Sequence, residues 1–326
     1  MRPLLLAVPL LLGAAAAQSA APLPSLPPAA TFPLRIDIMS QRSYPGSDLV
    51  IEQTLSSGVN YKRYIASYRS DGLKIYGLLT VPNAAVPKGG FPGLVFMHGY
   101  IPPNVYRTTE RYIAYVDAFA RAGFVVFKPD LRGHGSSQGE AQGAYWRPDY
   151  TIDTLNAFAS LRRFKTVNAD RIGMWGHSMG GYLTLRAMVL DKRIKAGSIW
   201  GGVVAPYNDI LNNWHRRDGG GPPPNSPSRR TRTQILETYG TPQTNPSFWN
   251  AISANSYLAR LNGPVELQHA IGDATVPVAF SRSLATGLRA AGKTYTLFEY
   301  PGDDHNISRN LSTALRRSVE FFRRSL

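Results

Sequence analysis

The stretch "RIGMWGHSMGGYLTLRAMVL", residues 171–190, decides the predicted fold. It opens with an apolar run, continues through a Gly-His-Ser-Met-Gly pentapeptide and ends in a segment of helical character. A serine in a tight turn between a strand and a helix has its hydroxyl lifted above the strand end, at the helix N-terminus. Gly176, Gly180 and Gly181 are the small residues that the crowded flanks of such a turn require. We therefore interpret Ser178 as a candidate nucleophile.

Short apolar runs recur along the chain, separated by segments with helical spacing. The runs are "GLVFMHG" (93–99), "GFVVFKPD" (123–130), "RIGMWGHS" (171–178), "AGSIWGG" (196–202), "PVELQHAIGD" (264–273) and "TYTLFEYPG" (294–302). The helical segments are 109–122, 151–164, 179–190, 279–291 and 309–325. Unbroken apolar strands are typical of a parallel sheet buried on both faces, and Asp71-Gly72 between two earlier runs indicates a hairpin. The pattern predicts an α/β fold with an eight-stranded, mostly parallel, doubly wound sheet.

The organisation of the chain around this sheet follows from composition. Residues 1–20 combine an early Arg with an apolar run and small residues, which is typical of a secretory signal peptide, and the run is short for a membrane span. We expect a secreted or periplasmic protein without a stable membrane anchor. Residues 21–58 predict an N-terminal lead-in, flexible in its Pro- and Ala-rich part, followed by one domain over 59–326. The interval 203–262 is too long for a plain connection and predicts a small inserted cap.

Composition also excludes several function classes. The chain has 36 Lys+Arg against 21 Asp+Glu and no Cys. Its basic residues form neither long runs nor clusters with interleaved aromatics, so we expect no nucleic-acid partner. Without cysteine the chain has no disulfide and no thiolate zinc site.

A serine hydroxyl needs a base to act as a nucleophile at neutral pH. Of the six histidines, His305 is the one in a loop after the last predicted strand, at the edge where ligands of such sheets bind. Asp273 follows the preceding strand, and the chain order Ser178, Asp273, His305 fits this architecture. Asp303 and Asp304 are rival partners because they share the loop of His305. We predict a Ser178–Asp273–His305 triad.

An oxyanion intermediate requires two N–H donors. The residue after the nucleophile, Met179, supplies one at the helix N-terminus. The loop "FMHGY" after an early strand supplies the second, and we assign it to the backbone N–H of Tyr100.

These motifs resemble the α/β-hydrolase superfamily and, more narrowly, the catalytic domain of the prolyl oligopeptidase (dipeptidyl peptidase and acylaminoacyl peptidase) family. The resemblance spans residues 60–325 and is carried by "YRSDGLKIYGLLTVP", "LVFMHGY", "VVFKPDLRGHGSSQG", "ADRIGMWGHSMGGYLTLRA", "IGDATVPV" and "YPGDDHNI". It implies an eight-stranded sheet, the triad named above and hydrolysis through an acyl-enzyme, with no metal and no organic cofactor.

One departure leaves the substrate open. Family peptidases carry a β-propeller before this domain, and residues 21–58 are too few to form one. A peptidase acting on short peptides and a stand-alone carboxylesterase are both retained as alternatives, and a catalytically inactive binding module is a third. We also expect the cap to select the substrate. Its arginines either attract a substrate carboxylate or form a solvated basic loop: Arg216, Arg217, Arg229, Arg230 and Arg232.

Overall fold

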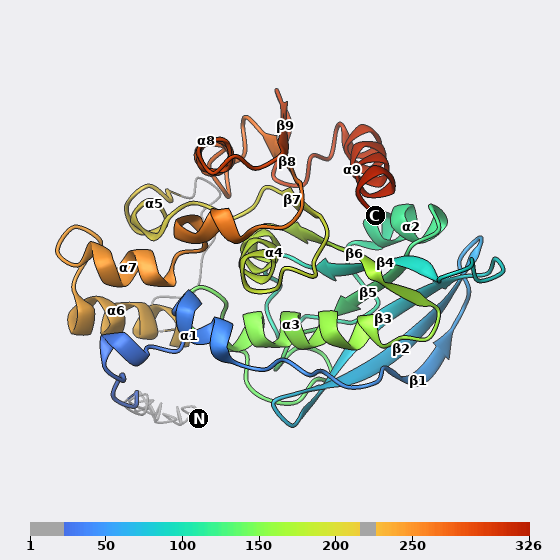
Figure 1. Ribbon diagram of the computed structural model, residues 1–326, viewed down its shortest axis with the longest axis horizontal. Coiled ribbons are helices and arrows are strands. Elements are labelled where there is room, and N and C mark those ends of the chain that lie inside the picture. The colour runs from blue at the N-terminus through green and yellow to red at the C-terminus, as the bar shows by residue number, and fades with distance from the viewer. Residues whose placement is uncertain (1–22, 216–225) are drawn as a thin grey trace, which may run out of the picture.

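The computed structural model describes residues 23–215 and 226–326, so the expected signal peptide (1–20), Arg216 and Arg217 lie outside the described residues. The described chain is built on one sheet with the strand order β1-β2-β3-β5-β4-β6-β7-β8-β9 (Figure 1). The strands are β1 (Val50–Leu55), β2 (Tyr61–Ser70), β3 (Leu73–Pro82), β4 (Phe91–Met97), β5 (Val125–Pro129), β6 (Val167–His177), β7 (Gly197–Trp200), β8 (Val265–Ala270) and β9 (Tyr295–Tyr300). Strands β4 to β9 pair in parallel, whereas β1, β2, β3 and β5 pair antiparallel in that order.

Helices cover both faces of the sheet, as the unbroken apolar strands predicted. The principal ones are α1 (Ile36–Gln41), α2 (Ile113–Arg121), α3 (Asp149–Arg162), α4 (Met179–Leu190), α8 (Ala279–Ala290) and α9 (Leu311–Ser325). In β4, Val95 and Met97 pack into the larger core with α3 and α4. Leu94 and Phe96 point the other way, into the core formed with α2 and α9. Alternate side chains of one strand therefore fill two cores, which is the doubly wound arrangement.

The sheet has one strand more than the eight predicted. The additional strand is β1, an antiparallel edge strand that pairs with β2. Its side chains are almost all exposed, with Val50 at 55% and Ile51 at 42%, so it lacks the apolar alternation by which strands are recognised. The predicted hairpin at Asp71-Gly72 is confirmed, because Asp71 (φ 51°) and Gly72 (φ 78°) join β2 to β3. Such a two-residue turn needs φ above zero at both positions.

The lead-in departs from the flexible segment that its composition suggested. Four of its apolar side chains are buried, of which the first three belong to the main core: Phe32, Leu34, Ile36 and Met39. The guanidinium of Arg186, a fully buried residue of α4, donates to the carbonyl oxygens of Leu34 (2.7 Å) and Ile252 (2.6 Å). The segment is therefore fixed to the domain by packing and by the hydrogen bond from the Arg186 side chain to its main chain.

The interval between β7 and β8, for which an inserted cap was predicted, contains several helical pieces and is called the insertion below. Its helical pieces are α5 (Tyr207–Asn212), α6 (Pro227–Tyr239), α7 (Pro246–Ile252) and the 3₁₀ segment η2 (Ala254–Arg260). The hydroxyl of Ser226 caps α6, and Pro227 stands at its first position, where the missing N–H costs nothing. Residue Trp249 of α7 is buried against Tyr207 of α5, with ring centroids 5.6 Å apart. The insertion therefore shares the core of the domain.

A buried carboxylate ties α9 to the sheet below the loop that carries His305. Glu266 Oε1 on β8 accepts hydrogen bonds from Ser198 Oγ (2.8 Å), Gln268 Nε2 (2.9 Å) and Ser318 Oγ (2.5 Å). Burial raises the pKa of Glu266, and these three donors only partly offset that effect. The native state therefore favours the protonated carboxyl more than the unfolded chain does.

We expect Glu266→Gln to stabilise the protein at pH 8, because a neutral amide oxygen accepts the same bonds without burying a charge. A gain of about 1 kcal/mol would raise Tm by roughly 2–4 °C. Since the pKa is raised on folding, the wild type recovers this stability as the pH falls, and the difference should vanish near pH 4. Thermal unfolding at both pH values checks the prediction, and an equal Tm difference at both would contradict it.

Candidate active site

Ser178 occupies the predicted turn between β6 and α4. Its backbone has φ 56° and ψ −116°, a strained conformation for a residue with a side chain. The turn is held by hydrogen bonds from Ser178 N to Trp200 O (2.9 Å) and from Val203 N to Ser178 O (3.1 Å). A Cβ at Gly180 would lie 1.9 Å from Met97 O. The glycine is thus required by the close approach of the first turn of α4 to the end of β4, as the sequence suggested.

His305 and Asp273 are in direct contact. His305 Nδ1 lies 2.6 Å from Asp273 Oδ2, and the Asp273 side chain is fully buried. The other carboxylate oxygen accepts from the N–H groups of Thr275 (2.8 Å) and Val276 (2.9 Å). Burial alone would raise the pKa of Asp273, but hydrogen bonds from His269, His305 and Val276 outweigh it and hold the pKa below its usual range. An ionised Asp273 fixes the proton of His305 on Nδ1 and leaves Nε2 as an acceptor.

The two rival carboxylates serve their own loop instead. Asp303 accepts hydrogen bonds from the main-chain N–H groups of Asp304, Arg309 and Asn310. Asp304 accepts from two further N–H groups, those of residues 306 and 308. Both carboxylates therefore shape the loop around His305, while the imidazole contacts Asp273.

The imidazole of His305 lies beside the end of β7, next to the Ser178 turn. A Cβ at Gly201 would be 3.1 Å from His305 Nδ1. The preceding residue, Trp200, accepts the hydrogen bond from Ser178 N. Ser178, Asp273 and His305 thus follow the carboxyl ends of β6, β8 and β9, on one edge of the sheet.

The loop after β4 passes on the other side of Ser178. A Cβ at Gly99 would lie 3.2 Å from Ser178 Cβ. The carbonyl oxygen of Gly99 is 2.7 Å from Nδ1 of the buried His98. Because the peptide is planar and trans, the N–H of Tyr100 points away from that carbonyl. The Tyr100 side chain is 54% exposed, and Met179 N stands at the start of α4, directly after Ser178.

Three residues around the site were not assigned a role from the sequence. His177 is buried, with Nδ1 2.7 Å from Tyr112 Oη and Nε2 3.0 Å from the main-chain oxygen of His305. His269 Nε2 lies 3.3 Å from Asp273 Oδ2 and 3.0 Å from Val276 O. No pattern in the sequence pairs Tyr112 with His177, since the two residues are 65 positions apart. His269 is only four positions from Asp273, so the spacing of these two residues was a signal in the sequence.

One aromatic side chain of the insertion, that of Trp214, contacts the turn of Asp273. Trp214 Nε1 donates to Thr275 O (2.7 Å). Its ring is 5.5 Å from that of Tyr145, which in turn is 5.0 Å from that of Tyr182 on α4. These three rings form an aromatic cluster that links the insertion to α4, the helix that begins directly after Ser178. Of the cap arginines, Arg229, Arg230 and Arg232 lie on α6.

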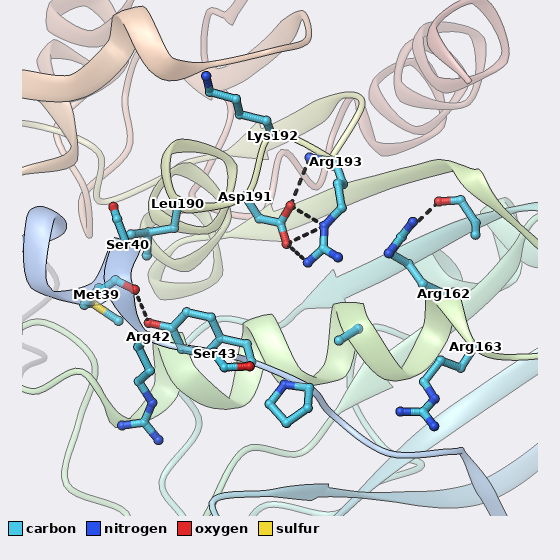
Figure 2. A pocket seen from close by; sticks show the side chains of 14 residues that line it. Met39, Ser40, Arg42, Ser43, Arg162, Arg163, Leu190, Asp191, Lys192 and Arg193 are labelled. Carbon is cyan, nitrogen blue, oxygen red and sulfur yellow. Dashed lines mark hydrogen bonds and ion pairs between the residues drawn. The ribbon is translucent and has the colours of Figure 1, made fainter.

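A cavity of about 530 Å³ lies elsewhere, at the far end of α4 (Figure 2). The helix has 12 residues, so its two ends are about 18 Å apart. Two of its basic residues have partners within it or beside it: Arg193 pairs with Asp191 (2.5 Å), and Arg162 Nε donates to Ala169 O (3.2 Å). The cavity is therefore separate from the candidate active site.

Two negative findings concern the part of the chain that the structure describes. There, no group of three or more His, Cys, Asp or Glu side chains could hold a metal ion. No helix among these residues has the length and apolar character that crossing a membrane demands.

Solved structures share this fold. Acetyl xylan esterase 1 from Thermoanaerobacterium sp. matches with a TM-score of 0.65 and 17% identity, over 88% of this chain and 90% of that one. The acylaminoacyl peptidase of Pyrococcus horikoshii also matches with a TM-score of 0.65, at 22% identity, over 82% of this chain and 42% of that one. The likeness confirms the predicted α/β-hydrolase fold.

Sequence relatives point to peptidases. The uncharacterized peptidase YtmA of Bacillus subtilis is 27% identical over 266 residues, covering 79% of this chain and 94% of the relative. Human dipeptidyl peptidase 8 is 26% identical over 72% of this chain, which spans only 25% of that protein. The model of the prolyl oligopeptidase family matches residues 111–326. This match takes in the elements from α2 to the last residue, and the protein belongs to the prolyl oligopeptidase family of serine hydrolases.

Proposed function

We propose that the protein is a secreted serine hydrolase that cleaves acyl ester or short peptide and amide bonds through an acyl-enzyme. The observation that carries the proposal is the 2.6 Å contact between His305 Nδ1 and Asp273 Oδ2, at the sheet edge where Ser178 occupies its strained turn. The proposed export rests on the composition of residues 1–20.

In the proposed mechanism, Ser178 Oγ attacks the substrate carbonyl carbon while its proton passes to Nε2 of His305. The oxygen that gains negative charge is stabilised by the N–H groups of Met179 and Tyr100. His305 then gives its proton to the leaving oxygen or nitrogen, and an acyl-Ser178 ester remains. Water attacks this ester, its proton passes to His305 and then to Ser178 Oγ, and the acid product leaves. Asp273 stays ionised and stabilises the transient imidazolium.

A stand-alone carboxylesterase is the second candidate. It is favoured by the coverage of the structural neighbours, since this chain spans 90% of the acetyl xylan esterase but only 42% of the acylaminoacyl peptidase. The acyl and leaving-group preference depends on the shape of the pocket. Within the aromatic cluster, Tyr145 and Trp214 are only partly buried, and their rings would suit an apolar acyl or aminoacyl group.

Covalent labelling tests the proposal. The purified protein is treated with a fluorophosphonate and digested, and the labelled peptide is identified by mass spectrometry. We expect one label, on Ser178, and a loss of esterase activity in proportion to the fraction of protein labelled. A label on another residue, or none, would overturn the proposed mechanism. A panel of aryl esters, aminoacyl amides and acyl-aminoacyl amides then separates esterase from peptidase by kcat/KM.

A further inference from the structure

A chain of hydrogen bonds runs behind the candidate nucleophile, from the loop after β4 to the loop of His305. Gly99 N lies 2.9 Å from Tyr112 Oη, and Tyr112 Oη lies 2.7 Å from His177 Nδ1. His177 Nε2 lies 3.0 Å from His305 O. The chain therefore connects three segments that are far apart in the sequence, through the residue directly before Ser178.

The two ends of this chain fix the direction of every bond in it. The N–H of Gly99 can only donate and the carbonyl of His305 can only accept. His177 must then carry its proton on Nε2, which leaves Nδ1 to accept from the Tyr112 hydroxyl. Tyr112 in turn accepts from Gly99. All the donors and acceptors of this chain are paired as long as His177 is neutral. A second proton on Nδ1 would remove the acceptor of the Tyr112 hydroxyl.

The surroundings keep His177 neutral. It is only 3% exposed, and its ring centroid is 4.5 Å from that of His305. Burial, followed by the charge on His305, lowers the pKa of His177 to about 3. His177 is therefore neutral at neutral pH, and the hydrogen-bond chain is intact there.

We propose that Tyr112 and His177 are positioning residues that hold the oxyanion loop at Gly99 and the main chain of His305 in register across Ser178. This inference rests on the proposed function and adds two residues to its machinery. Acyl transfer requires the base and the N–H donors to be placed within a fraction of an ångström, and a displacement of about 1 Å can cost about 10²-fold in rate. The two loops come from opposite sides of Ser178, so a direct link between them supplies that precision.

The backbone at Tyr112 supports a specific role. Arg111 (φ 56°) and Tyr112 (φ 53°) are consecutive left-handed residues, a conformation that residues with side chains rarely adopt. The strained pair directs Tyr112 to Gly99 and His177 directly before α2 begins. One turn later Tyr115 Oη donates to Asn306 O (2.9 Å), next to His305. The N-terminal end of α2 thus contacts the candidate histidine loop by two routes.

Tyr112→Phe tests the proposal by removing one oxygen atom. We expect kcat for p-nitrophenyl acetate to fall by about 10- to 100-fold, while KM stays within about twofold because the acyl pocket is untouched. Tyr61→Phe is the matched control, since it removes the hydroxyl that bonds Asp117 Oδ1 (2.8 Å) in the middle of α2. This control should retain wild-type kcat. Thermal unfolding of both variants verifies that rates are measured on folded protein.

Replacement of His177 gives an independent measurement. A glutamine side chain can donate to His305 O through its amide nitrogen and accept from Tyr112 through its oxygen, whereas leucine can do neither. We expect His177→Gln to retain at least tenfold more kcat than His177→Leu. In the double variant of Tyr112→Phe and His177→Leu the two losses should not add, because both break the same chain.

Three results would overturn the proposal: Tyr112→Phe as active as Tyr61→Phe, His177→Gln no better than His177→Leu, or additive losses in the double variant. Failure of the proposed function is distinguished by Ser178→Ala. If Ser178→Ala is inactive while the Tyr112 and His177 variants keep full kcat, only the positioning role is rejected. If Ser178→Ala keeps its activity, the triad itself is rejected.

Discussion

Ser178→Ala is expected to lower kcat for p-nitrophenyl acetate by about 10⁶-fold, the scale of loss when a serine hydrolase is deprived of its nucleophile. The side chain is the only source of the attacking oxygen in the proposed mechanism, and no neighbouring hydroxyl stands in the same strained turn. Alanine keeps the Cβ and the backbone of Ser178, including the bond from its N–H to Trp200 O. The fold should therefore survive, with Tm within a few degrees of the wild type.

Ser136→Ala is the matched control for this loss. Ser136 is an exposed serine in "RGHGSSQG", a stretch as rich in glycine as the one around Ser178. It should retain full kcat and full fluorophosphonate labelling, whereas Ser178→Ala should lose both. Residual labelling of Ser178→Ala at the wild-type rate would show that another residue is the nucleophile.

The elements nearest the candidate site could be predicted almost to the residue. The sequence pattern placed helices at 179–190, 279–291 and 309–325, and the structure has α4, α8 and α9 at Met179–Leu190, Ala279–Ala290 and Leu311–Ser325. These helices could be predicted because each has apolar residues at helical spacing and follows a turn that contains Gly or Pro. The periodicity and the turn residues therefore indicate the same helix boundaries. The strand that precedes Ser178 could be predicted because its last six residues form a buried run next to a glycine-rich turn.

The parts that could not be predicted are those whose order depends on distant partners. The lead-in is Pro- and Ala-rich, yet Leu34 and Ile36 are fully buried and Arg186 binds the carbonyl of Leu34. Composition reports the propensity of a segment by itself, whereas this segment is ordered by the surface it covers. The same holds for β1, whose order comes from pairing with β2 and whose side chains face solvent.

The residues of the candidate site likewise fall into a group that the sequence predicts and a group that depends on distant partners. Ser178, Asp273 and His305 each follow a strand, so topology alone predicted that they converge. His177 and Tyr112 contact each other by side chains across 65 positions of sequence. Tyr112 is directed toward His177 by two consecutive left-handed residues before α2. These residues are Arg111 and Tyr112, and no glycine or asparagine marks that conformation in the sequence.

Asp273→Asn is expected to lower kcat by about 10⁴-fold, the effect of the equivalent change in serine-protease triads, or about 5 kcal/mol of transition-state stabilisation. An asparagine oxygen can still accept from Thr275 N and Val276 N, which now bond Asp273 Oδ1. Its NH₂ group would then face His305 Nδ1. That nitrogen must become an acceptor, so the proton moves to Nε2 and the imidazole can no longer receive the proton of Ser178.

Asp303→Asn provides the comparison that separates the two carboxylates. Asp303 accepts main-chain bonds within the His305 loop, and an asparagine oxygen can accept part of them, so the loss in kcat should stay below about tenfold. The ratio between the two variants matters more than either value. If Asp303→Asn lost as much as Asp273→Asn, the carboxylate that orients His305 would be supplied by its own loop. If only Asp273→Asn loses activity, and its Tm is unchanged, the carboxylate that fixes the tautomer of His305 is that of Asp273, in the turn after β8.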